Sequence, residues 1–127
     1  MKFTKKQIDR YSRQIILKKI GVIGQKKLLK ASVLIVGAGG LGSPIAIYLT
    51  ALGIGEIGII DKDSVEISNL SRQIIFSTND LKKKKSYTAI NKLRKINPDT
   101  KLHSFNKRLT KKNINQIAKN FDLIVDG

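Results

Sequence analysis

The stretch Ser32–Pro44, SVLIVGAGGLGSP, decides the fold of this chain of 127 residues. A short apolar run leads into a glycine-rich turn, and the residues after the turn have the character of a helix start. Glycines suit such a turn because they reach positive φ without a Cβ clash and let a phosphate approach the backbone. The N–H groups at the helix start favour an anion. The pattern predicts a nucleotide-binding turn, with plain packing of a strand against a helix as the alternative.

The composition predicts one cytoplasmic domain. The length suffices for a single modest core. The chain has no Cys, which excludes disulfides, zinc–cysteine sites and thiol catalysis within it. No apolar run reaches the ~18 to 20 residues of a membrane helix, and the basic N-terminus lacks the apolar region of a signal peptide. We therefore expect no membrane partner.

The net charge of +16 would suit nucleic acid, acidic lipid or an acidic protein. Lys supplies most of the 25 basic residues, and Ile and Asn are also abundant, which is typical of compositional drift. The few aromatic residues are not interleaved with basic ones as a stacking platform requires. We do not expect nucleic acid to be the main partner.

Two regions follow from the local patterns: a helical arm over 1–31 and a Rossmann-like domain over 32–127. In the arm, the capping-box pattern Thr4–Gln7 predicts a helix over 5–18, and Gly21 and Gly24 are expected to break the chain before a short helix over 25–31. In the domain, we expect strands over 33–36, 56–61, 101–106 and 121–127, and helices over 41–52, from a cap at Asn79 or Asp80 to residue 96, and over 110–120.

Right-handed crossovers then predict an α/β fold with a mainly parallel sheet in the order 3-2-1-4 and a ligand at the carboxyl edge of the strands. The fourth strand would leave an apolar edge without a partner strand. We therefore expect the chain to be the first half of a larger fold or part of an assembly.

Asp61 ends the second strand, 24 residues after Gly37. A carboxylate at this place in a βαβ nucleotide fold accepts hydrogen bonds from ribose hydroxyls, whereas a turn-capping aspartate is the alternative. The polar segment 63–76 beside this edge favours a functional loop. His103 lies near the middle of the third strand, and no ligand spacing accompanies it, which favours a structural role.

The run Lys82–Lys85 is expected in the first turn of the third long helix, where four cations oppose the helix dipole. A phosphate partner for at least one of these lysines would explain the run, and lysine-rich composition is the alternative. The physical chemistry of the sequence leaves both open.

Several segments together resemble one family. They are RYSRQI at 10–15, GAGGLGS at 37–43, IDKD at 60–63, SNLSRQ at 68–73, INP at 96–98 and DLIVD at 122–126. This combination is similar to the ThiF/MoeB/HesA family, bacterial relatives of ubiquitin-activating enzymes, from about residue 8 to the end. The resemblance implies that ATP and Mg²⁺ bind, and that the C-terminal glycine of a ubiquitin-like sulfur-carrier protein is adenylated. It also implies a homodimer that serves thiamine or molybdopterin synthesis.

The resemblance assigns roles by position. The nucleotide would be held by Gly37, Gly39, Gly40, Gly42, Asp61, Asp63, Asn69, Arg72 and Lys85. Of these, Asp61 would hold the ribose, while Asn69, Arg72 and Lys85 would contact the phosphates. Arg13 would reach the ATP of the neighbouring subunit, so that Arg13, Arg72 and Lys85 form the catalytic set. Lys82 stands where the family often has a glycine.

Other family features fall outside this chain. The magnesium-binding aspartate should come about two residues after Gly127, so no metal ligand is assigned here. The later cysteine, the zinc site and most of the carrier-binding surface are also absent. We therefore expect the nucleotide-binding half of an adenylyltransferase. A non-catalytic ATP-binding or assembly module is the alternative, and an NAD-dependent oxidoreductase is a more distant one.

Overall fold

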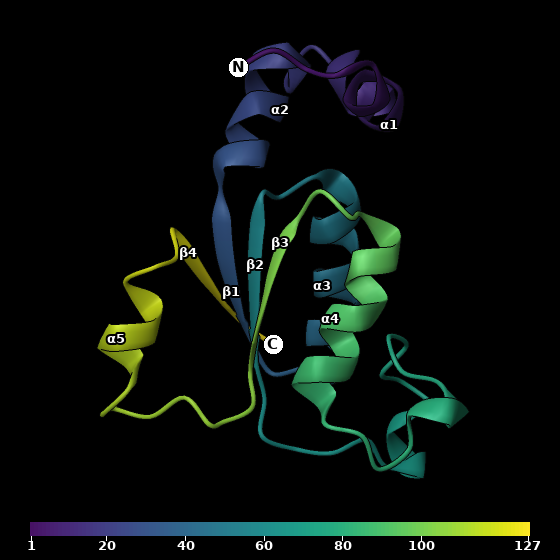
Figure 1. Ribbon diagram of the computed structural model, residues 1–127, viewed down its shortest axis with the longest axis vertical. Coiled ribbons are helices and arrows are strands. Elements are labelled where there is room, and N and C mark those ends of the chain that lie inside the picture. Colours follow the sequence, from purple (N-terminus) through teal and green to yellow (C-terminus); the bar gives the residue numbers. More distant parts are fainter.

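The computed structural model describes residues 1–127 as a four-stranded sheet with helices on both faces (Figure 1). The sheet is built in the order β3-β2-β1-β4, from β1 (Ser32–Val36), β2 (Glu56–Ile60), β3 (Lys101–Phe105) and β4 (Leu123–Asp126). Every pairing between neighbouring strands is parallel. The predicted α/β fold and its strand order are confirmed.

The helices lie in three places around the sheet. α3 (Gly42–Leu52) and α4 (Lys85–Ile96) cover one face, and the short α5 (Ile114–Ala118) lies on the other (Figure 1). α1 (Lys5–Ile15) and α2 (Gly21–Lys30) lie beyond the amino end of β1. No helix combines the length and the apolar character needed to cross a bilayer.

The alternation of residues along the strands explains this layering. Val33 and Ile35 belong to the main core cluster with Ala46 of α3 and Leu93 of α4. Leu34, between them, joins a smaller cluster on the α5 side. Successive strand residues point to opposite faces, so a continuous apolar run buries both faces of β1.

The arm differs from the prediction at its glycines. The predicted break at Gly21 and Gly24 is wrong, because both residues lie in α2. Gly21 begins this helix with φ +59°, and Gly24 packs so closely that an added Cβ would lie 3.1 Å from Cγ2 of Ile20. The predicted capping box of α1 is present: Gln7 N–H donates to Thr4 Oγ1 at 3.1 Å, and Thr4 N–H donates to Gln7 Oε1 at 2.9 Å.

The predicted helix start at Asn79 or Asp80 is also wrong, and the four lysines do not share a helical turn. α4 begins at Lys85; Lys82 has φ +69° and Lys84 is extended. The backbone here pairs with an earlier segment, since Lys82 N–H donates to the Val65 carbonyl and Val65 N–H donates to the Lys83 carbonyl, both at 2.8 Å. This tertiary pairing replaces helical hydrogen bonds before Lys85. Of the four lysines, only Lys85 therefore lies in the first turn of α4, where its charge opposes the helix dipole.

The C-terminal elements are shorter than predicted. Thr110 and Asn113 bond to each other before α5, which has only five residues, and the last strand begins at Leu123. Leu123 and Ile124 are exposed on β4, whose outer side has no strand beside it. The apolar outer edge predicted for the fourth strand is therefore present.

Candidate nucleotide-binding site

The turn between β1 and α3 presents a row of free backbone donors. The N–H groups of residues 39–42 donate no hydrogen bond within the chain. Gly37 opens the turn with φ +92°, and an added Cβ on Gly42 would lie 1.9 Å from the Gly37 carbonyl oxygen. Only glycine fits at either position. Free N–H groups at a helix start form a binding site for an anion such as a phosphate.

Asp61 stands beside this turn at the end of β2. Its Oδ2 accepts from the Ala38 N–H at 2.9 Å, and its Oδ1 accepts from the Asp63 N–H at 2.8 Å. A carboxylate has about four acceptor positions, so about two remain available. A pocket of about 160 Å³ opens here between Gly37, Asp61 and the residues that follow β3. This geometry suits a ligand with paired hydroxyl groups.

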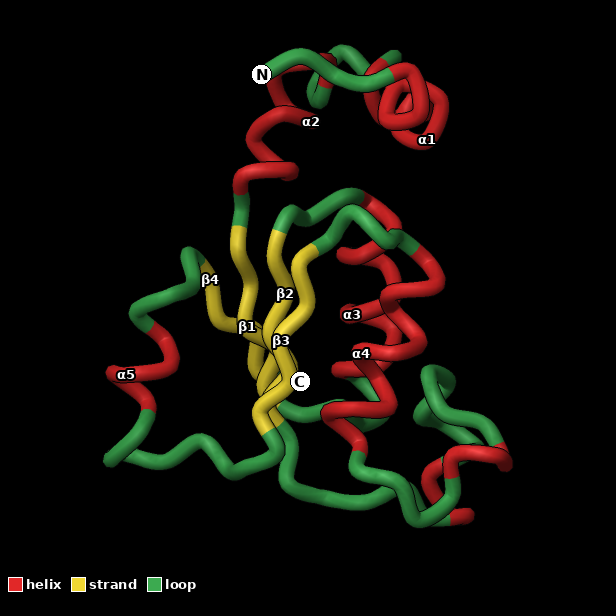
Figure 2. The backbone as a smooth tube through the Cα atoms, viewed as in Figure 1, coloured by secondary structure: helices red, strands yellow, loops and turns green.

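The loop after β2 returns to the glycine turn, at the end of the sheet where β1 and β2 finish (Figure 2). Within it, Asn69 is buried and accepts from the Glu66 N–H at 2.8 Å. The exposed Arg72 donates to the Ser68 carbonyl at 3.0 Å, and its Cγ would lie 3.6 Å from a Cβ added to Gly40. A cationic side chain therefore lies against the free N–H groups.

Lys85 is a largely buried residue whose ammonium has no acidic partner within the chain. Its residue is 6% exposed, and its ammonium makes no hydrogen bond or ion pair within the chain. Its N–H donates to the Asp63 carbonyl at 3.0 Å, which ties the start of α4 to the end of β2. The side chain lines a polar pocket of about 250 Å³ with Asp63, Glu66 and Asn69. The Lys85 ammonium has no partner within the chain, so it is free to pair with an anionic group of a ligand.

Some residues at this edge escaped the sequence analysis. Gln73 is 4% exposed, its Oε1 is buried without a partner, and its Nε2 would lie 3.9 Å from a Cβ on Gly39. Lys107 and Arg108 line the pocket of Asp61. Two features of the sequence could have indicated these residues. Gln73 lies in the segment 68–73, and the two cations come directly after the third strand.

Arg13 is not brought to this edge. Its neighbours fasten α1 to the C-terminal ends of α3 and α4: Arg10 donates to the Ile96 carbonyl at 3.0 Å, and Gln14 donates to the Leu52 carbonyl at 2.7 Å. Tyr11 is fully buried, and its hydroxyl accepts from Asn97 at 2.8 Å. Because the candidate site lies at the opposite ends of these helices, about 16 Å away at 1.5 Å per residue, the exposed Arg13 does not reach the site of its own chain.

Two further observations concern the acidic and histidine side chains. No three His, Cys, Asp or Glu side chains form a group that could hold a metal ion. His103 lies on β3 with its Nε2 2.6 Å from Glu56 Oε1, in a cross-strand pair. The candidate site thus combines the free N–H groups of the glycine turn, the Asp61 carboxylate and several cations, which lie in the loop after β2, at the start of α4 and after β3.

Comparison with known proteins identifies the family of this chain. The model of the ThiF family matches residues 11–127. The chain is 44% identical over 127 residues to a sulfur carrier protein adenylyltransferase of Thermus thermophilus, covering 100% of this chain and 47% of that protein. It is 46% identical over 125 residues to a probable molybdopterin-synthase adenylyltransferase of Porphyra purpurea, covering 98% and 33%. The chain thus spans less than half the length of these relatives.

Solved structures give the same result. The Escherichia coli tRNA N6-threonylcarbamoyladenosine dehydratase TcdA in complex with ATP superposes with a TM-score of 0.92 at 25% identity, covering 100% of this chain and 52% of that chain. Escherichia coli MccB with AMPCPP and MccA superposes with a TM-score of 0.77 at 32% identity, covering 86% and 34%. With the family model matching nearly the whole length, this chain belongs to the ThiF family.

Proposed function

We propose that this chain is the ATP-binding part of an adenylyltransferase that activates the C-terminal glycine of a ubiquitin-like sulfur-carrier protein. The observation that carries the proposal is the row of free N–H groups at 39–42, flanked by Arg72 and with Asp61 beside it. The names of the similar proteins supply the substrate class, since they include a sulfur carrier protein adenylyltransferase. In this proposal, residues 1–31 form an arm and residues 32–127 the nucleotide-binding domain.

Each group has a physical reason for its proposed role. Asp61 holds the ribose hydroxyls because its oxygens are fixed by two backbone donors and keep free acceptor positions. The glycine turn, with Gly39, Gly40 and Gly42, lies along the phosphates. Arg72, Asn69 and Lys85 contact the triphosphate. Asp63 contributes through its carbonyl, which anchors Lys85.

The proposed reaction is a substitution at the α-phosphorus. A carboxylate oxygen of the carrier attacks this atom and forms the acyl adenylate. The bond to the bridging oxygen breaks, and pyrophosphate leaves with the electron pair. Negative charge moves onto the leaving group, where fixed N–H groups and cations stabilise it without reorganisation. Mg²⁺ would accompany ATP and neutralise its phosphates, and the reaction would take place in the cytoplasm.

The position of Arg13 supports a homodimer in the proposed function. This arginine is exposed, and it lies about a helix length from the site of its own chain. In a dimer it would contact the ATP of the partner subunit. The neighbouring Arg10, Tyr11 and Gln14 hold α1 rigidly enough to present it.

Two measurements on the chain test the proposal. Calorimetry should detect binding of ATP with Mg²⁺ and no comparable binding of NAD, whereas binding of NAD alone would reject the adenylyltransferase. Pyrophosphate exchange by the chain should then occur when a sulfur-carrier protein is added. ATP binding without exchange would instead identify a non-catalytic binding module. For variants of the candidate site such as Lys85→Met, the matched control is Lys95→Met. It removes a cation from the outer face of α4, away from the pockets of Asp61 and Lys85.

A further inference from the structure

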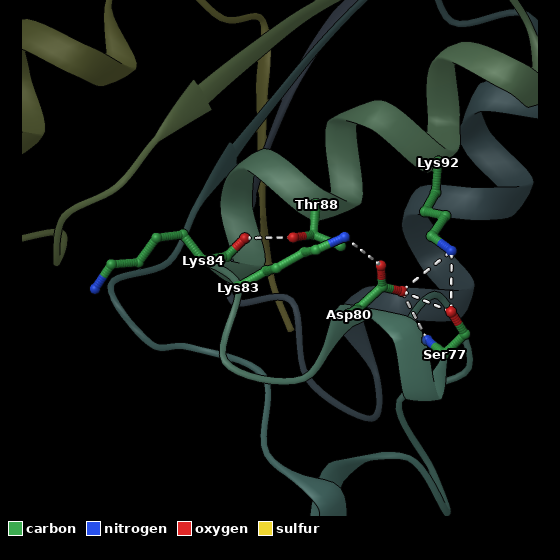
Figure 3. Close-up of polar contacts among 6 residues, drawn as sticks. All are labelled: Ser77, Asp80, Lys83, Lys84, Thr88 and Lys92. Carbon is green, nitrogen blue, oxygen red and sulfur yellow. Dashed lines mark hydrogen bonds and ion pairs between the residues drawn. The ribbon is translucent and has the colours of Figure 1, made fainter.

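The buried carboxylate of Asp80 lies beside the start of α4, between Ser77, Lys83 and Lys92 (Figure 3). Asp80 ends a 3₁₀ helix over Thr78–Asp80, and its side chain is only 6% exposed. Its Oδ2 accepts from Ser77 N–H at 2.8 Å, from Ser77 Oγ at 2.9 Å and from Lys92 Nζ at 3.1 Å. Lys83 Nζ lies 3.8 Å from Oδ1. One carboxylate therefore joins the loop and α4.

The direction of the Asp80 pKa agrees with this geometry. Burial raises the pKa of this carboxyl, but the hydrogen bonds from Ser77 and from Lys92, together with the charge of Lys92, outweigh burial and hold the pKa below its ordinary value. Asp80 is therefore ionised at neutral pH and pairs with Lys92 as a charge. The remaining cation of this pocket, Lys95, makes no ion pair with it.

Lys92 connects the cluster to the candidate site through α4. It follows Lys85 by seven residues, which is two helical turns, so both side chains leave the same side of the helix. Thr88 lies between them, and its hydroxyl donates to the Lys84 carbonyl at 2.8 Å, which holds the first turn. The rotation of α4 about its axis therefore sets the direction of both lysines.

The loop supplies the second connection. Lys83 N–H donates to the Asp80 carbonyl at 3.0 Å. Lys82 and Lys83 pair with the backbone of Val65, and Lys85 N–H donates to the Asp63 carbonyl. Lys82 has φ +69°, a conformation that costs a residue with a side chain about 1 kcal/mol or more. A strained residue persists only where its surroundings fix it, and Asp80 is the polar anchor of this segment.

We propose that Asp80 is a positioning residue that holds Lys85 toward the phosphates through Lys92 and the loop before α4. This inference rests on the proposed function. Asp80 lines a different pocket from Lys85, so it does not touch the nucleotide. Its effect is transmitted through the direction in which Lys85 points.

Calorimetry on the full chain tests this role with ATP and with adenosine. Lys85→Met should weaken ATP binding about 10- to 100-fold, the range for one charge-assisted hydrogen bond, and leave adenosine binding unchanged. Asp80→Asn should weaken ATP binding about 3- to 10-fold in the same selective way. In the double variant, Asp80→Asn should add no further loss, because the contact it serves is already gone. Lys95→Met, in the pocket of Asp80, is the matched control.

The outcomes separate the two proposals. If the unchanged chain does not bind ATP, the proposed function fails. If it binds ATP, the positioning role is overturned by any of three results in a folded Asp80→Asn variant: an ATP affinity within twofold of the original, an equal loss for adenosine, or a full further loss beside Lys85→Met. Should Asp80→Asn not fold at the assay temperature, Lys92→Met is judged by the same criteria.

Discussion

Replacing Gly42 by alanine tests how tightly the glycine turn is packed. The added Cβ would lie 1.9 Å from the Gly37 carbonyl oxygen and 2.9 Å from its carbon, where contacts below 3.0 Å are essentially never seen. The carbonyl would have to retreat by about 1 Å. Gly37 cannot yield freely, because its own N–H is bonded to the Ile60 carbonyl at 2.9 Å.

We expect Gly42→Ala to lower the free energy of unfolding by about 3 kcal/mol, at the upper end of overpacking costs. With a urea dependence of about 2 kcal/mol per molar, the urea midpoint should fall by about 1.5 M. ATP affinity should fall as well, since the row of N–H groups is displaced.

Gly40→Ala is the matched control within the same turn. The nearest atom to its added Cβ is Arg72 Cγ at 3.6 Å, an ordinary contact, and its φ is not positive. Stability should therefore stay within about 1 kcal/mol, while ATP binding weakens because the methyl group occupies the proposed phosphate position. A urea midpoint for Gly42→Ala equal to that of Gly40→Ala would refute this account of the turn.

Three other predictions concern separate parts of the molecule. Asp61→Ala leaves two backbone N–H groups unpaired, so the free energy of unfolding should drop by about 1–3 kcal/mol and both ATP and adenosine binding should be lost; retained adenosine affinity in calorimetry would contradict the ribose role. Because the pKa of Asp80 lies below its ordinary value of 3.8, its ionised form stabilises the fold above that pH, and this contribution is lost as the pH falls through the folded-state pKa. The urea midpoint should therefore fall more steeply below about pH 4 in the original chain than in Asp80→Asn, and parallel curves would show that the carboxylate contributes nothing. Arg13→Ala should weaken ATP binding only where sedimentation shows a dimer, and unchanged affinity in a proven dimer would exclude the contact across subunits.

The sequence predicted the fold well because its signals are local and strong. The runs Val33–Ile35 and Ile57–Ile60 are buried on both faces of the sheet, so continuous apolar sequence alone indicates these strands. The strand order then follows, because the connections between parallel strands are right-handed. The lysine run was misassigned because its conformation depends on pairing with Val65, a partner distant in the sequence.

One part of the geometry of the candidate site was predictable from the sequence. The glycine turn and Asp61 meet because adjacent parallel strands end at one edge. Gln73 was missed because its significance lies in burial without a partner, which no sequence pattern expresses. Lys107 and Arg108 were missed because cations are common throughout this chain.

The central claim is that ATP binds on the free N–H groups of the glycine turn. The most direct measurement is an ATP titration with Mg²⁺, followed by the amide signals of the labelled chain in two-dimensional NMR. The largest shifts should fall on residues 39–42, with smaller ones at Asp61 and Lys85. Shifts confined to other surfaces, or none at saturating ATP, would contradict the account.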